Sequence, residues 1–236
     1  MLRRPEMDAI DRLYASDRLS YTDMTEPLRL GNASVAFESA GGIWIKMKSF
    51  GTAFGALLDP SGMDEMVAGC PTDCEMVSVH DAGLSERLQS RGFVLANPCS
   101  LFVMEKQVKL PEDTDFRVLD RSYLDFVAGH YSLFHDPEYI VFLLETQMLF
   151  GLFKGGEIVG FIGLHAEGAM GLLEVLPAFR RMGYGAELES CLCSYLQKKG
   201  LVPYGNVVDG NAASLALQAS LGMTRASLCS IWLSRQ

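Results

Sequence analysis

The chain has 236 residues, 49% of them apolar and 21% charged, a composition typical of a globular protein and not of a disordered one. Its net charge of −9 argues against a nucleic-acid partner, because phosphate backbones are bound by concentrated Lys and Arg. No apolar run reaches the roughly 18–20 residues of a membrane span, and the N-terminus lacks the apolar core of a secretory signal. We therefore expect a cytoplasmic protein without a membrane partner.

The first half of the chain alternates between strand and helix patterns. We expect a helix over 6–17, strands over 34–39 and 43–50 around a turn at 40–42, a strand over 75–79, a helix over 82–93 that Gly92 ends, and a strand over 100–108. A polar, proline-containing stretch over 109–115 is the best linker candidate.

The second half has a denser pattern. We expect a strand at 116–120, helices at 121–132 and 137–147, a hairpin over 149–168 that turns at Gly155-Gly156, a strand at 170–176, a helix at 184–199 stopped by Gly200, a strand at 204–208, a helix at 212–222 and a strand at 227–233. This order, β-α-α-β-β-β-α-β-α-β, predicts a mixed α/β fold.

An internal repeat relates the two halves. Residues 77–104 align without gaps to 207–234, and seven of the 28 aligned pairs are identical. The alternative is that any strand-helix-glycine-strand unit resembles another. We favour duplication, which predicts two copies of one fold, a domain over 1–110 and a domain over 111–236.

The six cysteines and four histidines do not form a metal-binding pattern. Cys70 and Cys74 lack a second pair at zinc-finger spacing, and the histidines are not arranged as HExxH. Without an export signal, reduced thiols are expected in place of disulfides. We predict no metal.

The stretch "EVLPAFRRMGYGAELES", residues 174–190, has the features of an anion site. A strand that runs through a glycine-rich turn into a helix presents backbone N–H groups at the positive end of that helix. Gly183 and Gly185 allow close approach of a ligand, while Arg180 and Arg181 add charged, fork-shaped donors. There is no Walker loop and no GxGxxG motif.

These residues resemble a known family. "RRMGYGA" is similar to the Arg/Gln-x-x-Gly-x-Gly/Ala loop of the GNAT superfamily of acyl-CoA N-acyltransferases, which holds the coenzyme A pyrophosphate, and "NVVDGNAASLALQASLGM" resembles the strand and helix that follow it. The resemblance covers about 114–236 and, through the repeat, weakly the first half. It is greatest to the glycine N-acyltransferase-like branch, which implies two tandem GNAT-like domains, the N-terminal one degenerate.

The resemblance implies a set of contacts to acetyl-CoA or another acyl-CoA. They are Val175, Leu176, Arg180, Arg181, Met182, Gly183, Tyr184, Gly185, Ala186, Asn211 and Ser214. The backbone N–H of Val175 or Leu176 would polarise the thioester carbonyl, between strands that splay apart. Asn211 is equally an ordinary helix N-cap, and Ser214 is also consistent with an ordinary helix position.

Glu174 is the candidate catalytic base, because it is a carboxylate in an otherwise apolar strand and burial would raise its pKa. Regular alternation would place it on the face opposite to Ala169 and Gly171, the positions where relatives commonly carry a base. A buried structural carboxylate is therefore the alternative role. Glu167 and His165 are further candidate bases.

The general acid is not evident. Relatives often carry a tyrosine seven residues after the helix asparagine, and Gln218 stands at that position here. Tyr204 or solvent would have to replace it, although a thiolate also leaves unaided.

The predicted function is transfer of an acetyl or other short acyl group to the amine of a small molecule or amino-acid-like acceptor. The alternative is a non-catalytic acyl-CoA-binding module on a GNAT fold. The oligomeric state, monomer or homodimer, is left open.

The first half is not expected to hold coenzyme A. The repeat offset projects the arginine loop onto residues 50–56, "FGTAFGA", in which both arginines are missing. Asp81 aligns with Asn211 in the repeat. The stretch 60–62 contains proline and glycine, which would shorten the helix that corresponds to 184–199. The first half is expected to form one wall of the acceptor pocket.

Overall fold

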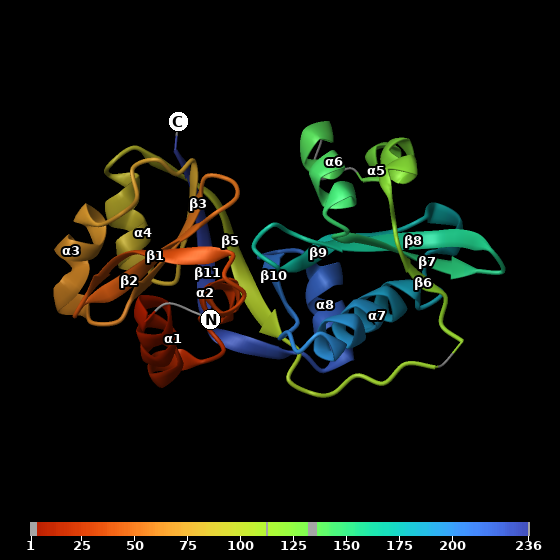
Figure 1. Cartoon of the computed structure of the whole chain (residues 1–236), viewed down its shortest axis with the longest axis horizontal. Helices are drawn as coiled ribbons and strands as arrows, with labels where there is room; N and C mark the ends of the chain where they lie inside the picture. Colours follow the sequence, from red (N-terminus) through yellow and green to blue (C-terminus); the bar gives the residue numbers. More distant parts are fainter. Residues whose placement is uncertain (1–3, 112, 132–135, 236) are drawn as a thin grey trace. The chain divides into compact units, whose positions relative to one another are not determined.

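A computed structural model describes residues 4–111, 113–131 and 136–235, and these residues form two compact units (Figure 1). Unit 1 consists of the described residues up to Val103, of Asn206–Ala212, and of those from Arg225 onward. Unit 2 consists of the described residues of Met104–Gly205 and of Ala213–Thr224. The C-terminal segment therefore belongs to the same unit as the N-terminal one.

Unit 1 is an α/β layer structure. Its elements are α1 (Arg4–Asp17), α2 (Thr22–Arg29), β1 (Ala33–Ser39), β2 (Gly42–Met47), β3 (Thr52–Leu57), α3 (Met63–Ala68), β4 (Met76–Val79), α4 (Ala82–Gln89), β5 (Phe93–Val103) and, apart from its first residue, β11 (Thr224–Arg235). The strands lie in the order β1-β2-β3-β4-β11-β5. The predicted helix at 6–17 and the predicted strands at 34–39, 43–50 and 75–79 are present, whereas α2, β3 and α3 were not predicted. The predicted bounds of the next two elements are wrong, because α4 ends at Gln89 and β5 begins at Phe93 and ends at Val103.

Alternation along β2 creates two cores in unit 1. Ile43 and Ile45 pack with α1 and α2 on one face, and Trp44 packs with α3 and α4 on the other. The Trp44 indole N–H donates to the Met66 carbonyl at 2.8 Å. Both faces of the sheet are thus covered by helices.

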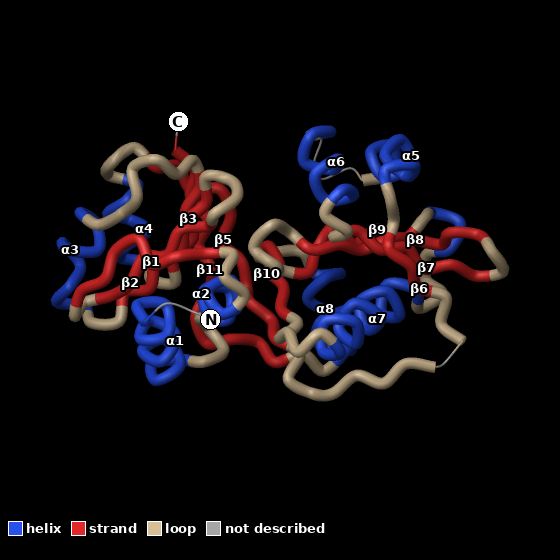
Figure 2. The backbone as a smooth tube through the Cα atoms, viewed as in Figure 1, coloured by secondary structure: helices blue, strands red, loops and turns tan. Residues whose placement is uncertain are grey.

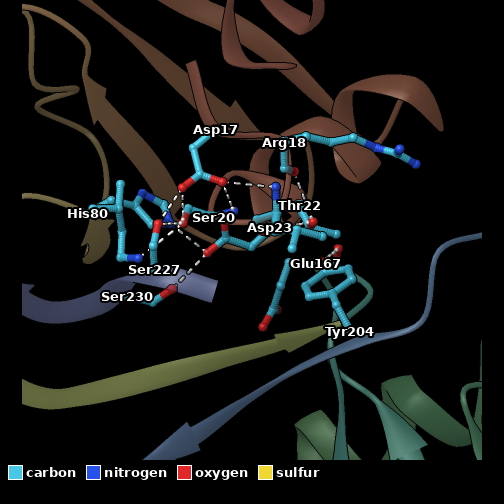
Figure 3. Close-up of polar contacts among 12 residues, drawn as sticks. Asp17, Arg18, Ser20, Thr22, Asp23, His80, Glu167, Tyr204, Ser227 and Ser230 are labelled. Atoms are coloured by element: carbon cyan, nitrogen blue, oxygen red, sulfur yellow. Dashed lines mark hydrogen bonds and ion pairs between the residues drawn. The ribbon is translucent and has the colours of Figure 1, made fainter. Parts of the chain in front are cut away.

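A buried polar network joins α2 to the C-terminal strand (Figure 3). The Asp23 carboxylate lies 3.0 Å from His80 Nε2 and accepts a hydrogen bond of 3.0 Å from Ser230 Oγ. Nearby, Asp17 accepts hydrogen bonds from Ser20 and Ser227. Burial alone lowers the pKa of His80, but the charge and hydrogen bond of Asp23, with the Gly55 carbonyl and Asp17, raise it above its usual value.

We expect Asp23→Asn to destabilise the protein by about 3–5 kcal/mol, because it leaves the buried His80 ring without its counter-ion. A raised histidine pKa stabilises the folded state fully below pH ~6.5, and this stability is lost as the pH rises through the folded-state value. Urea unfolding between pH 5 and 9 measures both effects. Asp8→Asn, an exposed change on α1, is the control and should change stability by less than about 0.5 kcal/mol. Equal stability of the two variants would contradict the prediction.

Unit 2 contains the stretch with the two arginines. Its elements are β6 (Phe116–Val118), α5 (Leu124–His130), α6 (Pro137–Glu145), β7 (Leu149–Lys154), β8 (Glu157–Leu164), β9 (Met170–Val175), α7 (Tyr184–Lys198), and most of β10 (Tyr204–Val208) and α8 (Ala212–Leu221) apart from the residues grouped with unit 1. The strands run in the order β10-β9-β8-β7-β6, with α5 and α6 on one face and α7 and α8 on the other (Figure 2).

The predicted order of elements in the second half is confirmed. The hairpin of β7 and β8 turns at Gly155 and Gly156, whose φ angles of 58° and 85° suit a type I′ turn. Gly200, with φ 73°, follows α7 as predicted. The predicted helix at 121–132 is a 3₁₀ turn followed by α5, and its last residue lies outside the described residues.

The mixed α/β class is confirmed, while tandem duplication stays a prediction. Unit 1 runs α1-α2-β1-β2-β3-α3-β4-α4-β5, and from α5 onward the second half runs in the same order of helices and strands. The two compact units are defined by their internal packing, so the division into domains over 1–110 and 111–236 stays a prediction. Residue 112, in the predicted linker, lies outside the described residues.

The projection of the arginine loop onto residues 50–56 is wrong, because Thr52–Leu57 form β3. The turn that precedes α3 is Pro60–Gly62, and α3 has six residues whereas α7 has 15. The gapless alignment of 77–104 with 207–234 thus cannot be extended to the residues before 77. At this turn the Asp59 carboxylate accepts the Ser61 N–H at 2.9 Å, so an acidic side chain lies in the turn where the second half has its arginines.

Candidate active site

A bulge in β9 decides which way Glu174 points. Across β8 and β9, Gly163 pairs with Gly171, and Phe161 pairs with Glu174. β9 therefore has one more residue than β8 in this interval, and Leu172 takes a left-handed φ of 51°. The extra residue places Glu174 on the same face as Gly171. The expectation that the two lie on opposite faces is wrong, because it assumed unbroken alternation.

The Glu174 carboxylate is half-buried and ion-paired. Its Oε1 lies 2.9 Å from Arg180 Nη2, and its side chain is 18% exposed. Burial, and then the charge of Glu174, raise the pKa of the Tyr131 hydroxyl. Glu174 is thus close enough to Tyr131 for its charge to be felt there.

His165 lies on the same face of β9. A Cβ built on Gly171 would stand 2.4 Å from His165 Nε2, so the imidazole occupies the space beside that glycine. Tyr139 Oη lies 3.2 Å from His165 Nδ1 and accepts a hydrogen bond of 3.2 Å from the Ala166 N–H. The structure therefore brings two of the candidate bases, Glu174 and His165, to one face of the sheet.

The Tyr204 hydroxyl already donates a hydrogen bond to the backbone. This buried hydroxyl donates to the backbone carbonyl of Glu167 at 2.7 Å (Figure 3). This geometry does not favour Tyr204 as the acid that protonates a leaving thiolate.

The arginine loop leads into α7 through a left-handed turn. Arg181 has φ 63° and Gly183, the N-cap, has φ 86°, and no side chain caps this helix among the described residues. The N–H groups of the first turn, which includes Tyr184, Gly185 and Ala186, are thus without a side-chain acceptor. Such a start favours an anion.

The two arginines have different surroundings. Arg180 bends back to β9, where its Nε donates to the Val175 carbonyl at 3.0 Å in addition to its contact with Glu174. Arg181, Met182 and Gly183 are exposed. Nε and Nη2 of Arg180 are thus engaged with β9, and a phosphate would compete with Glu174 for this guanidinium.

One of the two predicted backbone donors is already bonded. The Leu176 N–H donates to the Val159 carbonyl at 3.0 Å. Because successive N–H groups of a strand point to opposite edges, the Val175 N–H points away from β8 and towards the β10 edge. In the described residues, the register of β9 with β10 consists of the single pair Met170–Gly205. Val175 is thus the better candidate donor.

The two predicted cofactor contacts near α8 are grouped with different units. Ser214 is half-buried in the first turn of α8, in unit 2, whereas Asn211 precedes the helix in a segment grouped with unit 1. Gln218, the residue in the place of the tyrosine, is buried, and its Nε2 donates to Glu189 Oε1 at 2.7 Å.

Glu189 was not among the residues predicted for the site. Burial raises its pKa to about 7, an effect that the hydrogen bond from Gln218 opposes. The sequence contained a signal for it, because Glu189 lies between Leu188 and Leu192 in a predicted helix, and this spacing puts it on the apolar, buried face.

Neither a metal site nor a membrane-spanning helix is found in the part of the chain that the structure describes. Within it, no group of three or more His, Cys, Asp or Glu side chains is placed to hold a metal ion. No described helix has both the length and the apolar character needed to cross a bilayer.

Comparison with known proteins relates part of the chain to a known family. Residues 114–223, just under half of the chain, match the model of the acetyltransferase (GNAT) family. No curated protein matches the chain. The resemblance to GNAT proteins is confirmed for this segment, while the glycine N-acyltransferase-like branch stays a prediction.

Solved structures share the fold over nearly the whole chain. A Drosophila protein is 16% identical with a TM-score of 0.66, covering 98% of this chain and 95% of its own. A putative GNAT-family acetyltransferase from Novosphingobium aromaticivorans is 15% identical with a TM-score of 0.57, covering 93% and 98%. A GCN5-related N-acetyltransferase from Kribbella flavida is 13% identical with a TM-score of 0.58, covering 93% and 95%. At these identities the likeness shows the fold.

Proposed function

We propose that this protein is an acyl-CoA-dependent N-acyltransferase that transfers an acetyl or other short acyl group to the amine of a small molecule or amino-acid-like acceptor. The observation that carries the proposal is the start of α7, where exposed arginine and glycine residues lead into a helix without a side-chain cap. This start directly follows the strand that carries Glu174, so an anion-binding loop and a candidate base are neighbours. The match of residues 114–223 to the acetyltransferase (GNAT) family supports the same class.

In the proposed reaction, Arg180, Arg181 and the N–H groups of Gly183 to Ala186 hold the pyrophosphate of the substrate. A phosphate bound by Nη2 of Arg180 would compete with Glu174 for that donor. Phosphate binding would thereby release the carboxylate, which then accepts a proton from the incoming ammonium. His165, on the same face, is the second candidate for this role.

The Val175 N–H is the proposed donor to the thioester carbonyl, because it points to the edge where pairing with β10 ends. Gln218 is bonded to Glu189, and Tyr204 to the Glu167 carbonyl. We therefore propose that the thiolate leaves without a proton from either side chain.

The alternative of a non-catalytic acyl-CoA-binding module is not favoured, because the matching family is one of acetyltransferases. The same experiment distinguishes the two. Acetyl-CoA is incubated with the protein and a panel of small amines and amino acids, and free thiol is measured. We expect thiol release that depends on one class of amine.

Binding is measured in parallel by thermal unfolding. With a dissociation constant near 10 µM, 1 mM coenzyme A should stabilise the folded state by about 2.7 kcal/mol, which is a melting shift of about 5–10 °C. A shift without amine-dependent thiol release would support the binding module. No shift at 1 mM ligand would contradict the anion-binding loop itself.

A further inference from the structure

A buried carboxyl and a buried amide form a side-chain pair between α7 and α8. Gln218 Nε2 donates to Glu189 Oε1 at 2.7 Å, and the two residues are only 6% and 4% exposed. The pair lies within unit 2, and neither residue belongs to the arginine loop. The contact ties the helix that begins at this loop to the helix that follows Asn211.

The second oxygen of each side chain is also buried. Glu189 Oε2 and Gln218 Oε1 have no hydrogen-bond partner among the described residues. If Glu189 is ionised, both atoms are acceptors, so neither can satisfy the other, and a buried acceptor without a donor is costly. If Glu189 is protonated, the carboxylic acid has one donor and one acceptor, as the amide does, and the two groups are complementary.

We propose that Glu189 is a neutral carboxylic acid that donates from Oε2 to Gln218 Oε1, so that a ring of two hydrogen bonds joins α7 to α8. Loss of this proton breaks the hydrogen bond from Oε2. The fold of the unit that carries the arginine loop is then sensitive to pH, whatever ligand that loop binds.

The electrostatic surroundings agree with the geometry. Burial raises the pKa of Glu189 to about 7, with the bond from Gln218 as the opposing effect. On α7, Cys193 faces Glu189, and burial followed by this neighbour raises the pKa of its thiol to about 12. α8 has no ionisable side chain between Ala212 and Leu221.

The charged groups on the strands packed against α7 have other partners or other surroundings. Lys154 of β7 pairs with Glu187, Glu174 of β9 pairs with Arg180, and Glu157 of β8 is exposed. Among the described residues no cation is thus paired with Glu189, and protonation is the way in which its charge is removed.

The test compares the wild type with Glu189→Gln by thermal unfolding from pH 5 to 9. A carboxyl with a raised folded-state pKa binds its proton more tightly in the folded state, so its contribution to stability is present at low pH. That contribution falls between pH ~4.5 and ~7 and is constant above. We expect the melting temperature of the wild type, relative to Glu189→Gln, to fall by about 5 °C between pH 5 and 8.

A matched control is Glu187→Gln, on the same helix but with its carboxylate paired to Lys154. This variant should retain the pH dependence of the wild type. Infrared spectra of the folded protein at pH 6 should show the carbonyl band of a buried carboxylic acid, which is absent in Glu189→Gln and lost at pH 9. Parallel melting curves of wild type and Glu189→Gln, or no such band at pH 6, would overturn the proposal. Neither readout involves coenzyme A, so the result is independent of the proposed function.

Discussion

Replacing Arg180 and Arg181 together by alanine should lower the affinity for coenzyme A by a factor of about 10²–10⁴. Each lost charged hydrogen bond accounts for roughly 1.5–3 kcal/mol, and two such contacts are removed. Isothermal titration calorimetry measures the change. The single variants separate the two side chains, because Arg181 is exposed, whereas Arg180 already donates to Glu174 and to the Val175 carbonyl.

Arg121→Ala is the matched control, since Arg121 is an exposed arginine of the same unit that is paired with Glu145. Its removal should leave the affinity for coenzyme A unchanged. We also expect one coenzyme A per chain, because the turn before α3 has no arginine and is capped by Asp59. A stoichiometry near two, or tight binding by the double variant, would show that the ligand is held elsewhere.

Glu174→Gln should reduce turnover of acetyl-CoA with a reactive amine by about 10²–10⁴, the usual contribution of a general base. The affinity for coenzyme A should not fall, because the variant frees Arg180 from its ion pair. Stability should change little, since the pair is partly exposed and such pairs contribute about 0–1 kcal/mol. Thiol release under saturating acetyl-CoA, with a melting curve of the same preparation, measures these effects.

His165→Asn is the comparison variant, because this imidazole lies on the same face of β9 beside Gly171. If Glu174 is the base, this variant retains most of the turnover. The opposite result, with Glu174→Gln active and His165→Asn inactive, would assign the base to His165 and leave Glu174 as a partner of Arg180. A Glu174→Gln variant that melts much earlier than the wild type would also contradict the assignment.

Much of unit 2 could be predicted because its signals are local. Gly155 and Gly156 are residues that tolerate positive φ, so the hairpin turn follows from their identity. The glycine at position 183 and the apolar spacing after it likewise predict a helix that begins near Tyr184. The loop, its arginines and the neighbouring carboxylate are therefore evident from the order of residues along the chain.

The elements missed in unit 1 have weaker local signals. α2 contains Pro27 and three acidic or basic residues in eight, and seven of its eight residues are nevertheless buried. α3 has only six residues, fewer than a stable isolated helix needs. These helices depend on packing against the strands and not on their own propensity.

The α/β order, the glycine turns and the arginine loop can be predicted from the order of residues, since each depends on neighbours along the chain. Three other features depend on contacts between segments that are distant in sequence. The bulge at Leu172 turns Glu174 to the face of Gly171, because one unpaired residue reverses alternation and only the register with β8 reveals it. β11 joins unit 1 through its pairing with β4, and Glu189 meets Gln218 across two helices. Pairings between distant segments are set by which surfaces bury each other, and no local pattern contains that information.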